Sequence, residues 1–281
     1  MRFTKMEGLG NDFILIDGIK ETLPEDLSAF SKTICDRHFG VGADGVLVVL
    51  PSDIADIRMV ILNSDGSEAQ MCGNGIRCFA MYVYEKGILE KSAFAVETRA
   101  GIIRPELKFD GEIVSKVRVD LGVPRTKPKE IPVEIEGEDA LAYKLVLDGK
   151  EWTLNCVSMG NPHCVLFVPD AAALVHTLGP VLECHPIFPE HTNVEFVELI
   201  DRKTVKMRVY ERGCGETLAC GTGGAAVTVA AVKLGITDRN ITVRLLGGDL
   251  EYEYKEDGHV WMTGPAKRVA EGCYNYEKRK V

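Results

Sequence analysis

The sequence has a deficit of positive charge. It contains 33 lysines and arginines against 42 aspartates and glutamates, which gives a formal net charge of −9. A chain of this sign repels the phosphates of nucleic acids and of anionic membrane surfaces, so neither is expected as its main partner. It also lacks any apolar stretch near the ~20 residues that a transmembrane helix needs. Its first residues, MRFTKMEGLGNDFILID, lack the apolar core of a secretion signal. We therefore expect a cytoplasmic protein.

Cysteine is not scarce, but the usual functional cysteine patterns are missing. The nine cysteines are an odd number with irregular spacing, and none of them forms a C-x-x-C pair. A disulfide scaffold is therefore not expected, and a dithiol redox protein is disfavoured. Cys72/Cys78 and Cys214/Cys220 both have C-x₅-C spacing, which suits neither the C-x₂₋₄-C turn of structural zinc sites nor one face of a helix. No bound metal is expected.

One cysteine-containing pattern occurs twice. QMCGNGIRCFAMYVYEKG spans residues 70–87, and LACGTGGAAVTVAAVKLG spans residues 218–235. Cys220 follows Cys72 by 148 residues, and the closing glycines have the same separation. LGNDFILID (residues 9–17) recurs more loosely as MGNPHCVLFV (residues 159–168). The chain therefore repeats one plan of strands, C-G-x-G, helix and strands.

The apolar run after each C-G-x-G predicts a helix that is buried on all sides. Residues 76–84 carry one charge, on Arg77, and residues 223–232 carry none. Alternating segments such as KVRVDL (116–121) and TVKMRVYE (204–211) predict half-buried antiparallel strands. We expect an α/β protein of the α+β type. It would have two pseudo-symmetric domains, each a curled, mostly antiparallel sheet around a central buried helix.

Two other segments bear on the domain organisation. GVPRTKPKEIP (122–132) alternates charge with three prolines, which predicts a linker between the halves near Pro124–Pro132. GVGADG (40–45) satisfies the dinucleotide motif G-x-G-x-x-G, but that motif follows a strand and opens a helix. Here it precedes VLVVLP, a strand pattern, so we interpret it as a tight turn.

The position of the two repeated cysteines suggests acid–base chemistry. A thiol at a helix N-terminus meets unpaired backbone N–H groups and the positive end of the helix dipole, which predicts a pKa below the ~8.5 of free cysteine. The following glycines let backbone N–H groups approach a carboxylate. With pseudo-twofold symmetry, Cys72 and Cys220 are expected to face each other across a cleft. One would remove a proton from a carbon atom and the other would add one on the opposite face.

These stretches resemble diaminopimelate epimerases along essentially the whole chain. The matching segments are MEGLGNDFILID, GADGVL, NSDGSEAQMCGNGIRC, MGNPHCV, TNVEFV, VYERGCGETLACGTGGAA and VRLLGGDL. The resemblance implies a cofactor-independent isomerase that interconverts L,L- and meso-diaminopimelate in lysine and peptidoglycan precursor synthesis, commonly as a homodimer. It also implies that the C-terminal segment returns to the first domain. The expected halves are residues 1–124 with 268–281, and residues 125–267.

The resemblance further implies roles for individual residues. Cys72 and Cys220 would be the acid–base pair, and His163 and Glu211 would tune the two thiols. The implied substrate-binding residues are Asn11, Asn63, Gly73, Asn74, Asn161, Asn193, Glu211, Arg212, Gly221 and Thr222. Arg212 offers a planar fork suited to the distal carboxylate of the substrate. Gly45 stands where some members of the family have a substrate-contacting glutamine, so that contact is not carried over.

Two alternatives remain open. Proline racemases and hydroxyproline epimerases have the same two-cysteine plan, but their substrates lack a second carboxylate. The ERG segment at residues 211–213 and the set of asparagines favour diaminopimelate over those substrates. A non-enzymatic thiol-binding or redox protein is the alternative from another class.

Overall fold

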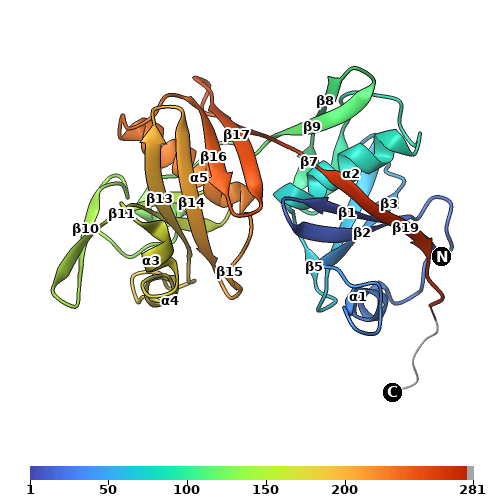
Figure 1. The fold of residues 1–281 in the computed structure, drawn as a ribbon, viewed down its shortest axis with the longest axis horizontal. Coiled ribbons are helices and arrows are strands. Elements are labelled where there is room, and N and C mark those ends of the chain that lie inside the picture. The colour runs from blue at the N-terminus through green and yellow to red at the C-terminus, as the bar shows by residue number, and fades with distance from the viewer. Residues whose placement is uncertain (277–281) are drawn as a thin grey trace. The chain divides into compact units, whose positions relative to one another are not determined.

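The computed structural model describes residues 1–276, which form two compact units (Figure 1). Unit 1 comprises Met1–Val119 with the described chain from Gly264 to residue 276, and unit 2 comprises Asp120–Thr263. The sequence predicted the divisions after residues 124 and 267. The assignment of each unit as one half of an epimerase stays a prediction.

Unit 1 is built on one sheet of mostly antiparallel strands in the order β19-β1-β2-β3-β4-β6-β7, with β5 paired to β4. The pairs β2/β3 and β4/β6 are parallel, and β8 and β9 form an antiparallel hairpin. The elements of unit 1 are β1 (Arg2–Gly8), β2 (Asn11–Asp17), α1 (Leu27–Cys35), β3 (Gly45–Leu50), β4 (Ile57–Asn63), β5 (Glu68–Ala69), α2 (Gly73–Glu85), β6 (Val96–Thr98), β7 (Gly101–Ile103), β8 (Glu106–Asp110), β9 (Ile113–Asp120) and β19 (Lys267–Cys273).

Helices α1 and α2 contact the sheet of unit 1 through different side chains. On β3, Val46 and Val48 pack in one cluster with Phe30 and Ile34 of α1. Leu47, which lies between them, points to the opposite face as strand geometry requires, and it lies against the first turn of α2. Helix α2 contacts β1, β2 and β3. The sheet is therefore covered by α1 on one face and by α2 on the other.

Unit 2 is built on a second mostly antiparallel sheet, in which the strands follow the order β10-β11-β12-β13-β14-β16-β17-β18 and β15 pairs with β14. The pairs β12/β13 and β14/β16 are parallel. The elements of unit 2 are a 3₁₀ turn η1 (Pro128–Glu130), β10 (Tyr143–Leu147), β11 (Lys150–Ser158), β12 (Pro162–Phe167), α3 (Ala171–Val175), α4 (Gly179–Glu183), β13 (Asn193–Asp201), β14 (Thr204–Glu211), β15 (Gly215–Glu216), α5 (Gly221–Lys233), β16 (Asn240–Leu245), β17 (Gly248–Tyr254) and β18 (Val260–Gly264).

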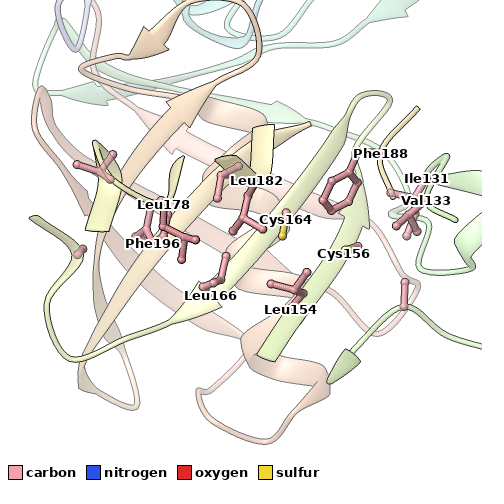
Figure 2. Packing of buried hydrophobic residues seen from close by; sticks show 14 residues of the cluster. Ile131, Val133, Leu154, Cys156, Cys164, Leu166, Leu178, Leu182, Phe188 and Phe196 are labelled. Carbon is pink, nitrogen blue, oxygen red and sulfur yellow. The ribbon is translucent and has the colours of Figure 1, made fainter. Parts of the chain in front are cut away.

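Two layers of helix also contact the sheet of unit 2. Helix α5 contacts β11, β12, β13 and β17, whereas α3 and α4 contact β13 and β14. Figure 2 shows the apolar core on the α3/α4 side, where Cys164 and Leu166 of β12 and Phe196 of β13 pack with Leu178 and Leu182. Because side chains alternate along a strand, the residues between these core positions face α5. That face carries the candidate site.

Both predicted buried helices are confirmed. α2 and α5 contain 13 residues each and begin directly after Cys72 and Cys220. Each is followed by a glycine with positive φ, 62° at Gly87 and 72° at Gly235, a conformation that glycine adopts without strain. The expected α+β fold, with two mostly antiparallel sheets and a buried helix on each, is confirmed as well.

The proline-containing segment that was predicted to be a linker belongs instead to the core of unit 2. Ile131 and Val133 are buried in the cluster of Figure 2, and Pro128 is buried in the 3₁₀ turn. Arg125 pairs with Ser158 through two backbone hydrogen bonds. The segment is therefore not a free linker, because Pro128 and Ile131 bury it at two points, although its charged side chains stay exposed.

The end of the described chain lies on unit 1. The backbone N–H of Tyr274 donates to the carbonyl of Met1 at 2.8 Å, and the Met1 amino group donates back to the Tyr274 carbonyl at 3.1 Å. The ring of Tyr276 meets the ring of Phe30 edge-on, with centroids 5.1 Å apart. Residues 277–281, the rest of the segment expected to return to the first domain, lie outside the described residues.

Candidate active site

Cys72 is the N-cap residue of α2. Its backbone is extended (φ −143°, ψ 117°), and its Sγ accepts a hydrogen bond from the backbone N–H of Gly75 at 3.3 Å. The same sulfur lies 3.7 Å from Oδ1 of Asn11 and can donate its proton there. The first N–H groups of a helix have no partner within it, so Gly73 and Asn74 present donors beside the thiol. This end of α2 is suited to an anion.

Asn11 is held in place from two directions. The turn before it has positive φ at Leu9 (60°) and Gly10 (86°), which matches the twist of a two-residue hairpin joining β1 to β2. Its Oδ1 accepts from the Nδ2 of Asn74 at 3.3 Å, and its own Nδ2 donates to Asp44 Oδ2 at 2.7 Å. Because a carboxylate only accepts, Asp44 fixes the Asn11 amide with its oxygen toward Cys72.

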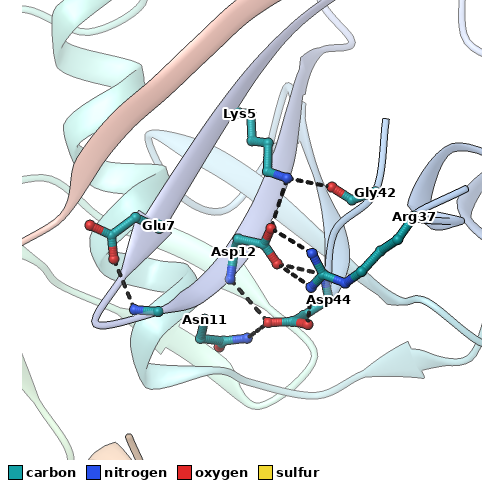
Figure 3. A network of polar contacts seen from close by, with 8 residues as sticks. Lys5, Glu7, Asn11, Asp12, Arg37, Gly42 and Asp44 are labelled. Carbon is teal, nitrogen blue, oxygen red and sulfur yellow. Dashed lines mark hydrogen bonds and ion pairs between the residues drawn. The ribbon is translucent and has the colours of Figure 1, made fainter. Parts of the chain in front are cut away.

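Asp44 belongs to a network of two carboxylates and two cations (Figure 3). Arg37 Nη2 lies 2.8 Å from Asp44 Oδ1 and 2.9 Å from Asp12 Oδ1. Lys5 Nζ lies 2.9 Å from Asp12 Oδ2 and donates to the Gly42 carbonyl at 2.6 Å. Burial acts to raise the pKa of Asp12, but the hydrogen bonds from Arg37 and Lys5 outweigh it and lower that pKa below its usual value. The network anchors the Asn11 side of the site.

The segment at residues 40–45 leads into β3 and not into a helix, as expected for a sequence that is not the dinucleotide motif. Gly45 pairs with Asn63 across β3 and β4. A Cβ atom at Gly45 would lie 2.6 Å from the carbonyl oxygen of Leu62, so this backbone has no room for a glutamine there. Asn63 is exposed, and its amide donates to Ser67 Oγ at 2.9 Å.

Cys220 caps α5 in the same way as Cys72 caps α2. Its backbone is extended (φ −120°, ψ 108°), and its Sγ accepts from the backbone N–H of Gly223 at 3.3 Å. Thr222 Oγ1 lies 3.6 Å from this sulfur. Gly221 and Thr222 present the first backbone N–H groups of α5, as Gly73 and Asn74 do for α2.

The surroundings of Cys220 work against its thiolate. Burial raises the pKa of this thiol well above its ordinary value, and the charges of Glu211 and Glu195 raise it further. The hydrogen bonds from Thr222 and from the Gly223 N–H act in the opposite direction but are weaker. The prediction of a lowered pKa was therefore wrong for Cys220. The helix N-terminus does not overcome burial next to two carboxylates.

A chain of hydrogen bonds leads away from Cys220. Thr222 Oγ1 accepts from Nδ2 of Asn161 at 3.4 Å, and Asn161 Oδ1 lies 3.2 Å from Nε2 of His163. The other ring nitrogen of His163, Nδ1, lies 2.6 Å from Glu195 Oε1. Both His163 and Glu195 are fully buried.

Glu195 is the residue of this cluster that the sequence interpretation missed. It lies on β13 at an α5-facing position, between Val194 and Phe196, which face the core of Figure 2. The signal was present in NVEFV, because a carboxylate in the middle of an apolar strand needs a buried partner. The partner could not be identified, because His163 lies 32 residues earlier on a strand of unknown register.

β14 ends at Glu211, which lies beside this cluster, and Arg212 follows it. Burial raises the pKa of Glu211, although a hydrogen bond from Thr217 and the charge of His163 oppose the rise. Arg212 is exposed, and its Nη1 donates to the carbonyl of Glu190 at 2.9 Å. None of the other guanidinium donors of Arg212 has a hydrogen-bond partner within residues 1–276. They are therefore available to a ligand.

The side chain of Asn193 forms hydrogen bonds with backbone groups of unit 2. Its Nδ2 donates to the carbonyl of Pro162 at 2.8 Å, and its Oδ1 accepts from the backbone N–H of Arg212 at 3.0 Å. The side chain is buried and ties β12 to the end of β14. In this position it orients the segment that carries Arg212.

The expected site residues thus form two groups, one in each unit. In unit 1, hydrogen bonds join Asn11, Cys72 and Asn74. Asn63 is not part of this group, and its amide donates to Ser67 instead. In unit 2, hydrogen bonds join Cys220, Thr222, Asn161 and His163, with Glu195 added.

Within residues 1–276 one group of side chains lies close enough to be tested as a metal site. His163, Glu195 and Cys220 are all buried, and their ligand atoms lie within 4.8 Å of one another. Zinc–ligand bonds of about 2.0–2.3 Å in a tetrahedron place ligand atoms roughly 3.3–3.6 Å apart. The separation of 2.6 Å between His163 Nδ1 and Glu195 Oε1 is that of a hydrogen bond. As folded, the group is a hydrogen-bonded cluster and does not have the ligand spacing of a zinc site.

Comparison with known proteins places the whole chain. The family model for diaminopimelate epimerase matches residues 3–127 and 155–269. The chain belongs to the diaminopimelate epimerase family. The diaminopimelate epimerase of Moorella thermoacetica is 52% identical over 276 residues, covering 98% of this chain and 99% of that protein. The diaminopimelate epimerase of Methanococcus maripaludis is 50% identical over 274 residues, covering 97% and 99%. Like these members of the diaminopimelate epimerase family, the protein is an isomerase.

Solved structures of other proteins share the fold of this chain at low sequence identity. A PhzF-family phenazine biosynthesis protein of Bacillus anthracis has a TM-score of 0.71 at 17% identity and covers 97% of this chain and 98% of its own. A hydroxyproline epimerase of Agrobacterium vitis has a TM-score of 0.68 at 16% identity, with coverages of 97% and 91%. None of the helices in residues 1–276 has the length and apolar character needed to cross a membrane.

Proposed function

We propose that the protein interconverts L,L- and meso-diaminopimelate by inverting one α-carbon with two cysteines. The observation that carries the proposal is that Cys72 and Cys220 are equivalent N-cap residues. Each accepts a backbone hydrogen bond of 3.3 Å at the start of a buried helix. Inversion needs two proton carriers on opposite faces of one carbon atom. Two thiols in equivalent positions supply two such groups.

In the proposed reaction one cysteine takes the α-proton as thiolate and the other delivers its own proton as thiol. The negative charge that develops on the carbon atom spreads into the adjacent carboxylate. Backbone N–H groups of Gly73, Asn74, Gly221 and Thr222 at the two helix N-termini would stabilise that charge without a cofactor. The raised pKa of Cys220 supports a resting state in which Cys220 holds its proton and Cys72 is the base.

The remaining expected residues would bind and orient the substrate. Arg212 would pair with the distal carboxylate through its free guanidinium donors, which sets which of the two α-carbons lies at the thiols. Asn11, Asn63, Asn161 and Asn193 would contact the substrate or orient the residues that do. His163 and Glu211 would tune the two thiols, and the charge of Glu211 acts on Cys220. The protein would act as a cytoplasmic homodimer in lysine and peptidoglycan precursor synthesis.

The decisive experiment is incubation of the protein with L,L-diaminopimelate in deuterated water. The expected result is formation of meso-diaminopimelate with deuterium at one α-carbon only, followed by NMR and mass spectrometry. L-Proline and trans-4-hydroxyproline, incubated separately, test the substrates of the related fold. If deuterium appeared only on proline or hydroxyproline, that compound would be the substrate instead of diaminopimelate. If none of the three compounds were labelled, the proposed reaction would be refuted.

A further inference from the structure

Glu195 is a buried carboxylate with few partners. Its side chain is fully buried, its Oε1 meets His163 Nδ1 at 2.6 Å, and its Oε2 has no hydrogen-bond partner in residues 1–276. A Cβ atom at Gly223 would lie 2.7 Å from Oε1, which places the carboxylate at the positive end of α5. A buried carboxylate in such a site requires a compensating charge, and His163 is the group in position to supply it.

Both ring nitrogens of His163 face oxygen atoms. Nδ1 faces the Glu195 carboxylate, and Nε2 faces Oδ1 of Asn161 at 3.2 Å. Both of these oxygen atoms act as acceptors. A ring that donates from both nitrogens satisfies both acceptors, and the pair is then an imidazolium and a carboxylate.

The donor–acceptor direction of these hydrogen bonds decides which hydrogen atom faces the sulfur of Cys220. Because the oxygen of Asn161 faces His163, its Nδ2 faces Thr222 and donates to Oγ1 at 3.4 Å. The hydroxyl hydrogen of Thr222 is then free to point at Cys220 Sγ, 3.6 Å away. If the Asn161 amide were reversed, its oxygen would face Thr222 and draw that hydrogen away from the sulfur.

We propose that Glu195 is a positioning residue for the second thiol. By holding His163 as an imidazolium it fixes the Asn161 amide and directs the Thr222 hydroxyl hydrogen at Cys220. That hydrogen stabilises the thiolate formed when Cys220 gives its proton to the substrate carbon, and it opposes the direct effect of the Glu195 charge, which disfavours the thiolate. The inference rests on the proposed function, in which Cys220 alternates between thiol and thiolate.

The first test reads the protonation of His163 directly in the full-length protein. With ¹⁵N-labelled histidine, both ring nitrogens of His163 should show bound hydrogen by NMR, and the His163→Gln variant assigns its signals. Glu195→Gln keeps the shape but removes the charge, so one nitrogen should lose its hydrogen. Glu195→Asp keeps the charge and should retain both. An unprotonated nitrogen in the wild type, or two protonated nitrogens in Glu195→Gln, would overturn the proposal.

This test is independent of turnover. If the wild type failed to epimerise diaminopimelate, the proposed function would fall while the NMR result would still show whether Glu195 fixes His163. If Glu195→Gln did not fold, the wild-type spectrum would still overturn the proposal if one ring nitrogen of His163 lacked hydrogen.

The second test asks whether the effect passes through Thr222. Glu195→Gln should lower kcat by about 10²-fold, as the loss of one donor to a developing charge does, and leave KM within about twofold. Thr222→Val should lower kcat similarly, whereas Thr222→Ser, which keeps the hydroxyl, should recover most of it. In the Thr222→Val background Glu195→Gln should add little, because the two changes act on one hydrogen bond. Independent, multiplying losses in the double variant, or an unchanged kcat in Glu195→Gln, would contradict the proposal.

Discussion

Cys72 and Cys220 make the same helix cap in different chemical surroundings. Each sulfur accepts a 3.3 Å hydrogen bond from the backbone N–H three residues ahead, in α2 and α5 respectively. Cys72 is partly exposed and lies beside the neutral amide of Asn11. Cys220 is buried beside the carboxylates of Glu195 and Glu211. The repeat supplies two thiols in equivalent positions, and the residues around them make the two thiols unequal.

Replacing either cysteine with serine should abolish most of the inversion. A hydroxyl is a far weaker acid than a thiol, so each variant loses one proton carrier, and the rate should fall by at least ~10²–10⁴-fold. The measurement is kcat/KM from L,L-diaminopimelate to the meso form. A single variant should still exchange the α-proton with solvent on the face served by the remaining thiol. Near-normal inversion in Cys72→Ser or Cys220→Ser would show that the two-base assignment is wrong.

The alkylation of Cys220 should report its raised pKa. In Cys72→Ser, the rate of iodoacetamide modification at Cys220, followed by mass spectrometry, should rise with a midpoint above the ~8.5 of a free cysteine. Glu211→Gln removes a negative charge that disfavours the thiolate, so its midpoint should lie at lower pH. Cys184, which is exposed, is the internal reference in the same digest. A Cys220 midpoint at or below that of Cys184 would contradict the account of its surroundings.

Arg212 should set the substrate preference through the distal carboxylate. Arg212→Lys keeps the charge but loses the fork, and Arg212→Ala leaves the carboxylate unpaired, a loss on the order of 2–5 kcal/mol when the pair is buried. The measurement is kcat/KM for L,L-diaminopimelate, and alanine should cost more than lysine. If both variants stayed within about threefold of the wild type, less than ~1 kcal/mol, Arg212 would not be the specificity residue.

The sequence was most informative where a feature lies within one segment. The repeated C-G-x-G and the apolar runs predicted α2 and α5 with a cysteine at the start of each. It was least informative where partners come from different strands. His163 meets Glu195 and Asn11 meets Asp44 only through the register of neighbouring strands and turns, which packing of the whole sheet decides.

The same limitation explains the error in the pKa of Cys220. The helix N-terminus that favours a thiolate is readable from the residues around the cysteine. The carboxylates that oppose the thiolate come from β13 and from the end of β14. Burial depends on the whole unit, and no local pattern reports how two strands place their charges against a helix end.

The network of Lys5, Asp12, Arg37 and Asp44 should make the stability of unit 1 sensitive to acid. The folded-state pKa of Asp12 is lowered, so its contribution to stability is complete above the unfolded value of ~3.9 and is lost as pH falls through the lower folded value. Asp12→Asn leaves Lys5 and Arg37 without this carboxylate (Figure 3) and should cost about 1–3 kcal/mol at pH 7. Urea unfolding from pH 7 to 3.5 measures the difference in free energy of unfolding between Asp12→Asn and the wild type. This difference should narrow only below about pH 4. A difference that is constant over this range, or absent at pH 7, would show that the charge of Asp12 is not what stabilises the network.

Gly75 and Gly223 hold the same place in the two repeats, and they should respond differently to alanine. A Cβ atom at Gly75 would lie 3.3 Å from Cys72 Cβ and 3.5 Å from its Sγ, which small shifts can accommodate. At Gly223 it would lie 2.7 Å from Glu195 Oε1 and 3.2 Å from Cys220 Sγ. A surface carboxylate would move aside, but Glu195 is buried and bonded to His163, so the contact must displace the cluster or the helix start.

Alanine also favours a helix over glycine by about 1 kcal/mol, so Gly75→Ala should leave the melting temperature near that of the wild type or above it. Gly223→Ala should lower the melting temperature and reduce kcat by about 10²-fold, as expected for a misplaced reacting group. Equal effects of Gly75→Ala and Gly223→Ala on melting temperature and kcat would show that the contact with Glu195 does not restrict position 223.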